Sequence, residues 1–284
     1  MKRGIRFAIG TQASAFALAL LWSTSAAMAQ VDLSDTAAKP GEHPLAPAIR
    51  IAESGLKYID ETVQDYSCTL IKRERINGEL GANQHIFVKV RHQPFSVYMY
   101  FLGPDDLKTN EAMYIEGRNR GKARCRTGRG LQSKFGWVSL DPNAVMMMKG
   151  QRYPITMTGI RYLTDQMIQI GKNDMKFGES EVKFFKGAKI NGRECMCIQS
   201  VHPTPRKQFR YHMARIFIDE EMTLPVRYAA YSWPKNPGGK PVLEEEYTYV
   251  NLKLNNGFTD ADFDDKAPGF RSAHDANNKR RLRR

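Results

Sequence analysis

Three consecutive glutamates, Glu244-Glu245-Glu246, come nearest to a pair of residues that could do acid/base chemistry. Side chains alternate between the faces of a strand, so Glu244 and Glu246 share one face and Glu245 points to the other. Carboxylates about 5–9 Å apart act as acid and base in glycoside hydrolysis, a separation that any such pair on a strand meets. Because no cleft is evident around them, we interpret the run as a solvated face and predict no catalytic residue.

The acidic stretch at residues 260–265 (DADFDD) begins like a calcium loop, with acids at positions 1, 3 and 5. Its sixth residue is Asp265 where glycine is needed for the turn, and its twelfth is an arginine where a glutamate belongs. We therefore interpret it as a closing turn, capped by Thr259 or Asp260 and anchored by Phe263. The six histidines form no zinc-binding pair. We predict no metal site and no cofactor.

The four cysteines leave two readings open. Cys195 and Cys197 are two residues apart in an expected strand, so their Cα atoms lie about 6.6 Å apart, an awkward distance for a mutual disulfide. A disulfide from one of them to Cys68 or Cys125 is one reading. Four free thiols, which pack like small apolar side chains, are the other.

Methionine and aromatic side chains are abundant, with 13 Met and 29 Phe, Tyr and Trp. In the run Met146-Met147-Met148 the three side chains cover nearly all sides of a short helix, so at least one must face something other than the core. Methionine is flexible and frequent on surfaces that accept varied apolar ligands. Ordinary core filling is the alternative.

The segments that must position these residues follow an α+β order. An apolar stripe from Leu45 to Val63 recurs every three or four residues and predicts a helix. Asp141-Pro142 opens a second, short helix that runs to Lys149, and a third helix covers 158–173. Alternating segments predict strands, with Asn191-Gly192 as the clearest hairpin turn. The expected strands are 66–75, 84–92, 95–102, 111–116, 121–126, 180–190, 193–201, 211–219, 225–233 and 242–254.

The first 29 residues have the features of an export signal. Lys2, Arg3 and Arg6 precede an apolar run from residue 13 to 22, and residues 27–29 (AMA) form a small-x-small cleavage site before Gln30. The apolar run is shorter than the ~20 residues that span a bilayer. The new N-terminus is not a lipid-accepting cysteine, so we expect a soluble, exported, periplasmic protein without a lipid anchor. An uncleaved anchor helix is the alternative.

Much of the basic charge lies at the two ends. The formal net charge is +13; without the three basic residues of the signal it is +10, and without the five of residues 279–284 (KRRLRR) it is +5. We interpret the end as a solvated tail; attraction to an anionic membrane or wall surface is its functional reading. No nucleic-acid-binding motif is present, and we expect no nucleic-acid partner.

Five stretches of the chain carry a resemblance to known proteins: 65–75 (DYSCTLIKRER), 95–98 (FSVY), 182–185 (VKFF), 214–219 (ARIFID) and 251–263 (NLKLNNGFTDADF). They resemble an exported bacterial family, domain of unknown function 1571, over roughly residues 45–265. The order of strands and helices also resembles the LolA/LolB-like lipoprotein-carrier fold, whose sheet wraps helices over an apolar cavity. The family has no assigned catalytic residues, and the ligand-latching residues of the carriers have no counterpart here.

The order of the segments predicts one α+β domain, with a single curved antiparallel sheet of about 9–11 strands and helices packed on one face. The resemblance implies that this sheet is a strongly curved, open half-barrel with the helices on its concave face. We expect a signal peptide at 1–29, a flexible leader at 30–43, the half-barrel at 44–265 and a basic, disordered tail at 266–284. The predicted function is non-catalytic binding or carriage of a lipid or lipoprotein acyl chain. The alternatives are an envelope sensor or scaffold that binds a protein partner through its helices and, third, a cell-wall hydrolase. The expected cavity residues are Tyr98, Tyr100, Met147, Ile160, Leu163, Met167 and Tyr228.

Overall fold

The computed structural model describes residues 31–268, 270, 272 and 273. The predicted export signal and the basic run at 279–284 lie outside the described residues. The predicted leader is partly packed: Val31 is buried against Ile51, Met196 and Ile218, and Leu33 lies against the same group. The chain therefore packs against the first helix and the sheet from the first described residue.

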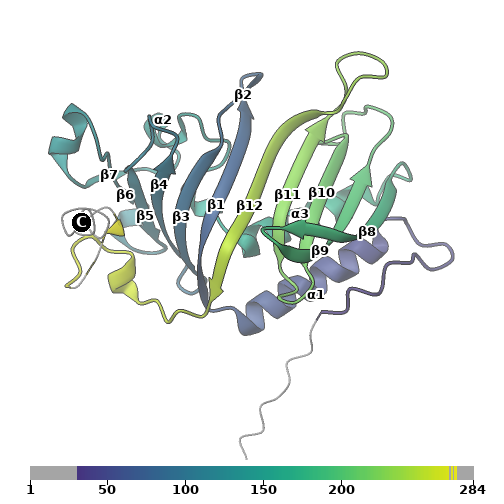
Figure 1. Cartoon of the computed structure of the whole chain (residues 1–284), viewed down its shortest axis with the longest axis horizontal. Coiled ribbons are helices and arrows are strands. Elements are labelled where there is room, and N and C mark those ends of the chain that lie inside the picture. Colours follow the sequence, from purple (N-terminus) through teal and green to yellow (C-terminus); the bar gives the residue numbers. More distant parts are fainter. Residues whose placement is uncertain (1–30, 269, 271, 274–284) are drawn as a thin grey trace, which may run out of the picture.

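The period-two segments form one antiparallel sheet of twelve strands (Figure 1). Across the sheet the order is β7-β6-β5-β4-β3-β1-β12-β11-β10-β9-β8, and β2 pairs only with β1. β7 and β8 are free edges, so the sheet is the predicted open half-barrel, with slightly more strands than expected. The strands are β1 (Asp65–Ile76), β2 (Glu79–Leu80), β3 (Gln84–Arg91), β4 (Ser96–Gly103), β5 (Glu111–Ile115), β6 (Ala123–Arg126), β7 (Val138–Leu140), β8 (Glu181–Ile190), β9 (Arg193–Val201), β10 (Met213–Asp219), β11 (Pro225–Ser232) and β12 (Val242–Leu254).

The hairpin expected at Asn191-Gly192 joins β8 to β9, with φ of 50° and 80° at the two turn residues. Left-handed backbone at both central positions is the type I′ pattern that matches the twist of the flanking strands. Asn77-Gly78 repeats the pattern between β1 and β2, with φ of 51° and 85°. Local turn chemistry therefore fixes the register of both hairpins.

Helices α1 (Ala46–Thr62) and α3 (Ile160–Asp174) pack against each other and against one face of the sheet, here called the inner face. Gly171 permits this closeness, because a Cβ there would lie 2.5 Å from Cδ1 of Ile49. At the start of α3 the N–H of Ile160 donates to the fully buried Tyr66 hydroxyl at 2.9 Å. Among the described residues no helix has the length and apolar character needed to cross a membrane.

The short helix expected from Asp141 to Lys149 is reduced to α2 (Val145–Met148). The Asp141 side chain accepts the N–H of Asn143 at 2.8 Å, which closes a local turn before a helix can begin. Ala144 is then extended, with ψ of 144°. The predicted cap is therefore used for a turn, and the helix starts four residues later.

The C-terminal segment covers the opposite, outer face. Phe263, which is 2% exposed, packs with Tyr98, Tyr100 and Met113, and the N–H of Ala273 donates to the Tyr98 hydroxyl at 3.0 Å. The acids of the predicted closing turn are engaged in ion pairs with outward-facing basic residues of the sheet, and Thr259 forms a capping box with Asp262. The pairs are Asp260 with Arg91 at 2.6 Å, Asp262 with Lys89 at 2.8 Å and Asp265 with Arg124 at 2.6 Å.

Candidate functional site

A cavity of about 540 Å³ lies between the inner face of the sheet and the segment that carries α2 and α3. Its walls are mostly apolar and include residues from eight strands, β1, β3 to β7, β11 and β12. Two of its lining residues, Phe135 and Met146, are 76% and 68% exposed, so the cavity reaches the protein surface. Apolar side chains that line it include Leu70, Ile86, Met99, Phe101, Ala112, Met147, Ile155, Met157, Leu163, Met167 and Ile170.

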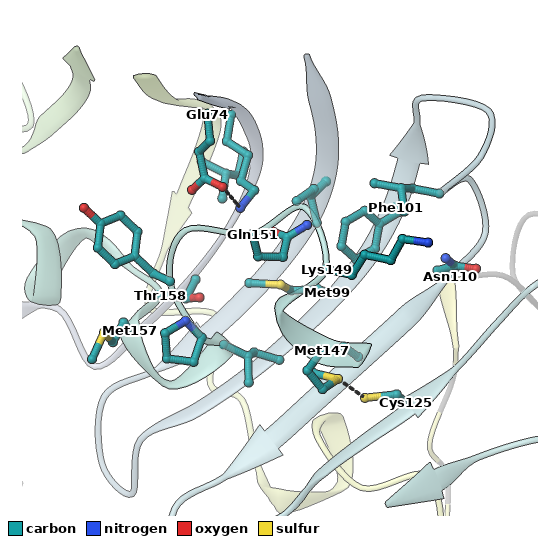
Figure 2. Close-up of a pocket in the computed structure, with 18 of the residues that line it drawn as sticks. Glu74, Met99, Phe101, Asn110, Cys125, Met147, Lys149, Gln151, Met157 and Thr158 are labelled. Carbon is teal, nitrogen blue, oxygen red and sulfur yellow. Dashed lines mark hydrogen bonds and ion pairs between the residues drawn. The ribbon is translucent and has the colours of Figure 1, made fainter. Parts of the chain in front are cut away.

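Sulfur is prominent in the wall. Met99 lies in the middle of the drawn residues in Figure 2, with Met157 and Met147 on either side. The Cys125 thiol donates to Sδ of Met147 at 3.1 Å, which ties β6 to α2. Flexible thioethers let such a wall adapt to ligands of different shape.

The structure brings four of the seven predicted site residues together. Met147, Leu163, Met167 and Tyr228 line the cavity, and their contact with a ligand stays a prediction. Ile160 is 2% exposed and belongs to the adjoining core instead of the lining.

The placement of Tyr98 and Tyr100 corrects the expectation. Both point to the outer face, where the C-terminal segment buries them. Met99 and Phe101 point inward, because successive residues of β4 alternate between faces. Both faces of β4 are apolar since both are covered, so the pattern alone does not identify the face that borders the cavity.

A polar group, here called the glutamate–tyrosine cluster, lies at one end of the cavity, and all of its members except Arg152 and Tyr211 line it. It consists of Lys72, Glu74, Arg152, Tyr153, Tyr211, Glu245 and Tyr247. Glu74 and Glu245 are direct partners across β1 and β12 and are 5% and 2% exposed. In Figure 2, Glu74 stands well apart from Asn110 and Lys149, so polar side chains lie on both sides of the methionine-lined middle part of the cavity.

Each buried carboxylate of the cluster is fully engaged. Glu245 accepts from the hydroxyls of Tyr211 at 2.7 Å and Tyr153 at 2.9 Å, and it pairs with Nε of Arg152 at 3.1 Å. Burial, with Glu245 close by, raises the pKa of the Tyr211 hydroxyl well above its ordinary value. Tyr211 therefore stays protonated and serves as a donor to the carboxylate.

Glu74 is held in the same way. It accepts from the Tyr247 hydroxyl at 2.6 Å, from the backbone N–H of Arg152 at 3.0 Å and from Nζ of Lys72 at 3.2 Å. A buried carboxylate is costly unless it has hydrogen-bond partners. The partners of Glu74 come from β1, β12 and the loop before α3, so these bonds connect the three segments. The cluster therefore fixes this end of the cavity.

The sequence analysis missed this cluster, although alternation carried the signal. Glu245, Tyr247 and Tyr249 are two residues apart along β12, so their side chains point to the same face, and all three line the cavity. Glu246 pairs with Arg227, while Glu244 pairs with Arg152 of the cluster at 3.6 Å and with Arg75 at 3.9 Å. The interpretation of the run as a solvated face is therefore wrong for Glu245.

A buried Ser–His–Asp arrangement lies at the far end of α3. His202 Nε2 is 3.1 Å from Asp174 and its Nδ1 is 3.2 Å from the Ser180 hydroxyl, while the ring stacks on Phe209 at 3.8 Å. Ser180 is 7% exposed and does not line the neighbouring cavity of about 110 Å³. We interpret the group as a cross-link between α3 and the start of β8.

The structure resolves the open question about the cysteines: Cys68, Cys125, Cys195 and Cys197 are all free. Only Cys125 lines the large cavity. Burial raises the pKa of its thiol from an ordinary value near 9 to about 12, and that of Cys195 to about 11. A thiol reacts as its thiolate, so these cysteines are poor nucleophiles at neutral pH.

We predict that labelling of Cys125 by a disulfide reagent at pH 8 is about a thousandfold slower than that of an unperturbed thiol, and that it rises with pH until about 12. Because the unfolded chain releases these thiol protons near pH 9 and the folded chain keeps them, the contribution of the two thiols to stability is constant below pH 9 and is lost as the pH rises toward 12. Urea unfolding from pH 8 to 11 measures this. Fast labelling at pH 8 of the folded protein, compared with its Cys125→Ser variant, would contradict the prediction.

Solved structures with a similar arrangement include lipoprotein LppX of Mycobacterium tuberculosis, at 12% identity and a TM-score of 0.44, with 75% of this chain and 98% of that chain covered. A DUF1329 family protein from Desulfovibrio piger matches at 12% identity and a TM-score of 0.38, covering 78% and 98%. A LolA superfamily protein from Nitrosomonas europaea matches at 10% identity and a TM-score of 0.30, covering 75% and 97%. Similarity at this level carries no argument about a ligand.

No curated protein matches the chain. The profile of one family, described as "Protein of unknown function (DUF1571)", matches residues 63–272, which run from the end of α1 to the C-terminal segment. The match includes the inner face of the sheet, α2, α3 and both glutamates of the cluster. The chain therefore belongs to the DUF1571 family.

Proposed function

We propose that this protein binds and carries an apolar or amphiphilic molecule, such as a lipid or the acyl chain of a lipoprotein, in the cell envelope. The observation that carries the proposal is the cavity of about 540 Å³ between the inner face and α2 and α3. Its size falls within the ~300–1,000 Å³ of small-molecule sites. The export signal that implies the envelope is a feature of the sequence at residues 1–29.

The lining supports an amphiphile with an acyl chain. Burial of a chain contributes about 0.8 kcal/mol per CH₂ group, so the methionine-lined part can hold it without covalent chemistry. Beside the glutamate–tyrosine cluster, the exposed Arg210 lines the cavity and stacks over the Tyr153 and Tyr211 rings at 5.7 and 5.2 Å, so it offers a cationic group to a polar headgroup. We therefore place the acyl chain beside Met99 and Met147 and the polar group beside Glu245 and Arg210.

Lipid extraction and mass spectrometry of the purified protein test the proposal. We expect a co-purifying amphiphile near one per chain and, after delipidation, saturable binding of a fluorescent apolar probe such as N-phenyl-1-naphthylamine. A protein that carries no lipid and takes up no probe would contradict the proposal and favour the scaffold alternative. Slower labelling of Cys125 on binding would locate the probe, because this is the cysteine that lines the cavity.

A further inference from the structure

Four apolar side chains protrude from the segment that borders the cavity opening. Leu131 and Phe135 lie on the 3₁₀ helix η2 (Leu131–Phe135), and Val145 and Met146 lie on α2. Their exposed fractions are 79%, 76%, 89% and 68%, whereas the other exposed large apolar side chains of the described chain reach at most 46%. We call these four residues the apolar rim.

The apolar rim is continuous with the cavity. Phe135 and Met146 belong both to the rim and to the cavity lining, while Leu131 and Val145 belong to the rim alone. Both short helices lie toward the end of the sheet that carries β5, β6 and β7 (Figure 1). Apolar side chains therefore extend without a break from the protein surface at the rim into the cavity, and an apolar molecule could enter along them.

Basic residues alternate with the apolar ones. Arg129, Lys134 and Lys149 are exposed, and none forms an ion pair with any residue in the described part of the chain. Between residues 129 and 149 the one acidic residue is Asp141. Asp105 and Asp106 lie with Lys108 on the turn that precedes Thr109, next to Gly128, so the formal charge of all these groups together is +1.

Protruding apolar side chains flanked by lysine and arginine are the pattern of segments that insert shallowly into a bilayer. Exposed apolar patches mark interaction sites, and anionic headgroups attract each nearby basic residue. We propose that the apolar rim docks on the surface of an anionic bilayer, with Leu131, Phe135, Val145 and Met146 in the acyl boundary. The unpaired basic groups and the cavity that opens at the rim favour a lipid surface over a protein. The inference goes beyond ligand binding, because docking does not require an occupied cavity.

Vesicle co-sedimentation of the full chain tests the docking. We expect binding to vesicles of phosphatidylglycerol and phosphatidylcholine, and weaker binding to phosphatidylcholine alone. The Leu131→Ser/Val145→Ser variant should bind the anionic vesicles about tenfold less tightly, because it loses two inserted side chains. Replacing Arg129, Lys134 and Lys149 by Gln should weaken this binding about a hundredfold.

Two controls make the result specific. Phe185→Ser removes an apolar side chain that is 46% exposed on the opposite sheet edge, β8, and should leave vesicle binding unchanged. Replacement of the five basic residues in 279–284 by Ser should leave a dependence on Leu131 and Val145. Unchanged vesicle binding by the rim variant, or its loss in the tail variant alone, would overturn the proposal.

The same variant separates docking from ligand binding. Leu131 and Val145 do not line the cavity, so probe uptake should be the same as in the wild type. A wild-type dimer that the rim variant converts to a monomer in sedimentation velocity would mean that a second copy covers the rim, and would also overturn the docking. If the wild-type protein takes up no probe but still binds the vesicles, the proposed function is refuted and the docking is not.

Discussion

Replacing Glu245 by alanine is expected to lower the free energy of unfolding by about 2–4 kcal/mol. The carboxylate is 2% exposed, and its loss leaves the hydroxyls of Tyr153 and Tyr211 without their carboxylate acceptor, while Arg152 keeps its longer ion pair with Glu244 at 3.6 Å. A buried donor left without an acceptor costs more than the hydrogen bond itself contributes. Urea unfolding followed by circular dichroism at pH 7 measures the change.

Glu246→Ala is the matched control, one position along the same strand. Glu246 pairs with Arg227 on the other face, where the side chains are 18% and 30% exposed, so its loss should cost at most about 1 kcal/mol. Glu245→Gln keeps the size and one acceptor and should fall between the two. Equal unfolding midpoints for Glu245→Ala and Glu246→Ala would contradict the buried network.

This contrast shows what alternation can and cannot predict. The parity of Glu245, opposite to Glu244 and Glu246, follows from the sequence alone. The burial of Glu245 does not, because it depends on the loop at Arg152 and Tyr153, far away in the chain, whose side chains contact the carboxylate. A charged residue on an apolar face is identified as buried only when its partners are known.

Most of the fold could be predicted because its signals are local. The alternation of apolar and polar residues predicted ten of the twelve strands, and asparagine–glycine pairs marked the turns of two hairpins. The two-residue β2 and three-residue β7 are too short to show a period, and α2 is short because Asp141 uses its side chain in a turn. These elements depend on their neighbours more than on their own residues.

The candidate site was only partly predictable for a related reason. Leu163 and Met167 could be placed at the cavity because α3 has one apolar stripe. Tyr98 and Tyr100 could not be placed, because β4 is covered by the helices on one face and by the C-terminal segment on the other. The cover over the outer face depends on Phe263, about 160 residues later in the chain.

Filling the cavity should weaken ligand binding about fiftyfold without destabilising the protein. Met99 and Leu163 lie on facing walls, on β4 and α3, and both border the cavity of about 540 Å³. In the Met99→Trp/Leu163→Trp variant the indole rings occupy space that an acyl chain would use. If three methylene groups lose their place, at about 0.8 kcal/mol each, affinity for the apolar probe falls about fiftyfold, while the unfolding midpoint is unchanged or higher.

Met196→Trp provides the opposite case. Met196 is 2% exposed on β9, packed among Val31, Ile51 and Ile218, and it does not line the cavity. The larger ring should overpack that core and lower stability by about 1–3 kcal/mol. The two variants make the same kind of change in filled and unfilled space, so their stabilities should diverge. Comparable destabilisation of both variants would mean that the interior beside Met99 and Leu163 is close-packed in solution, and a carrier needs that interior to be open.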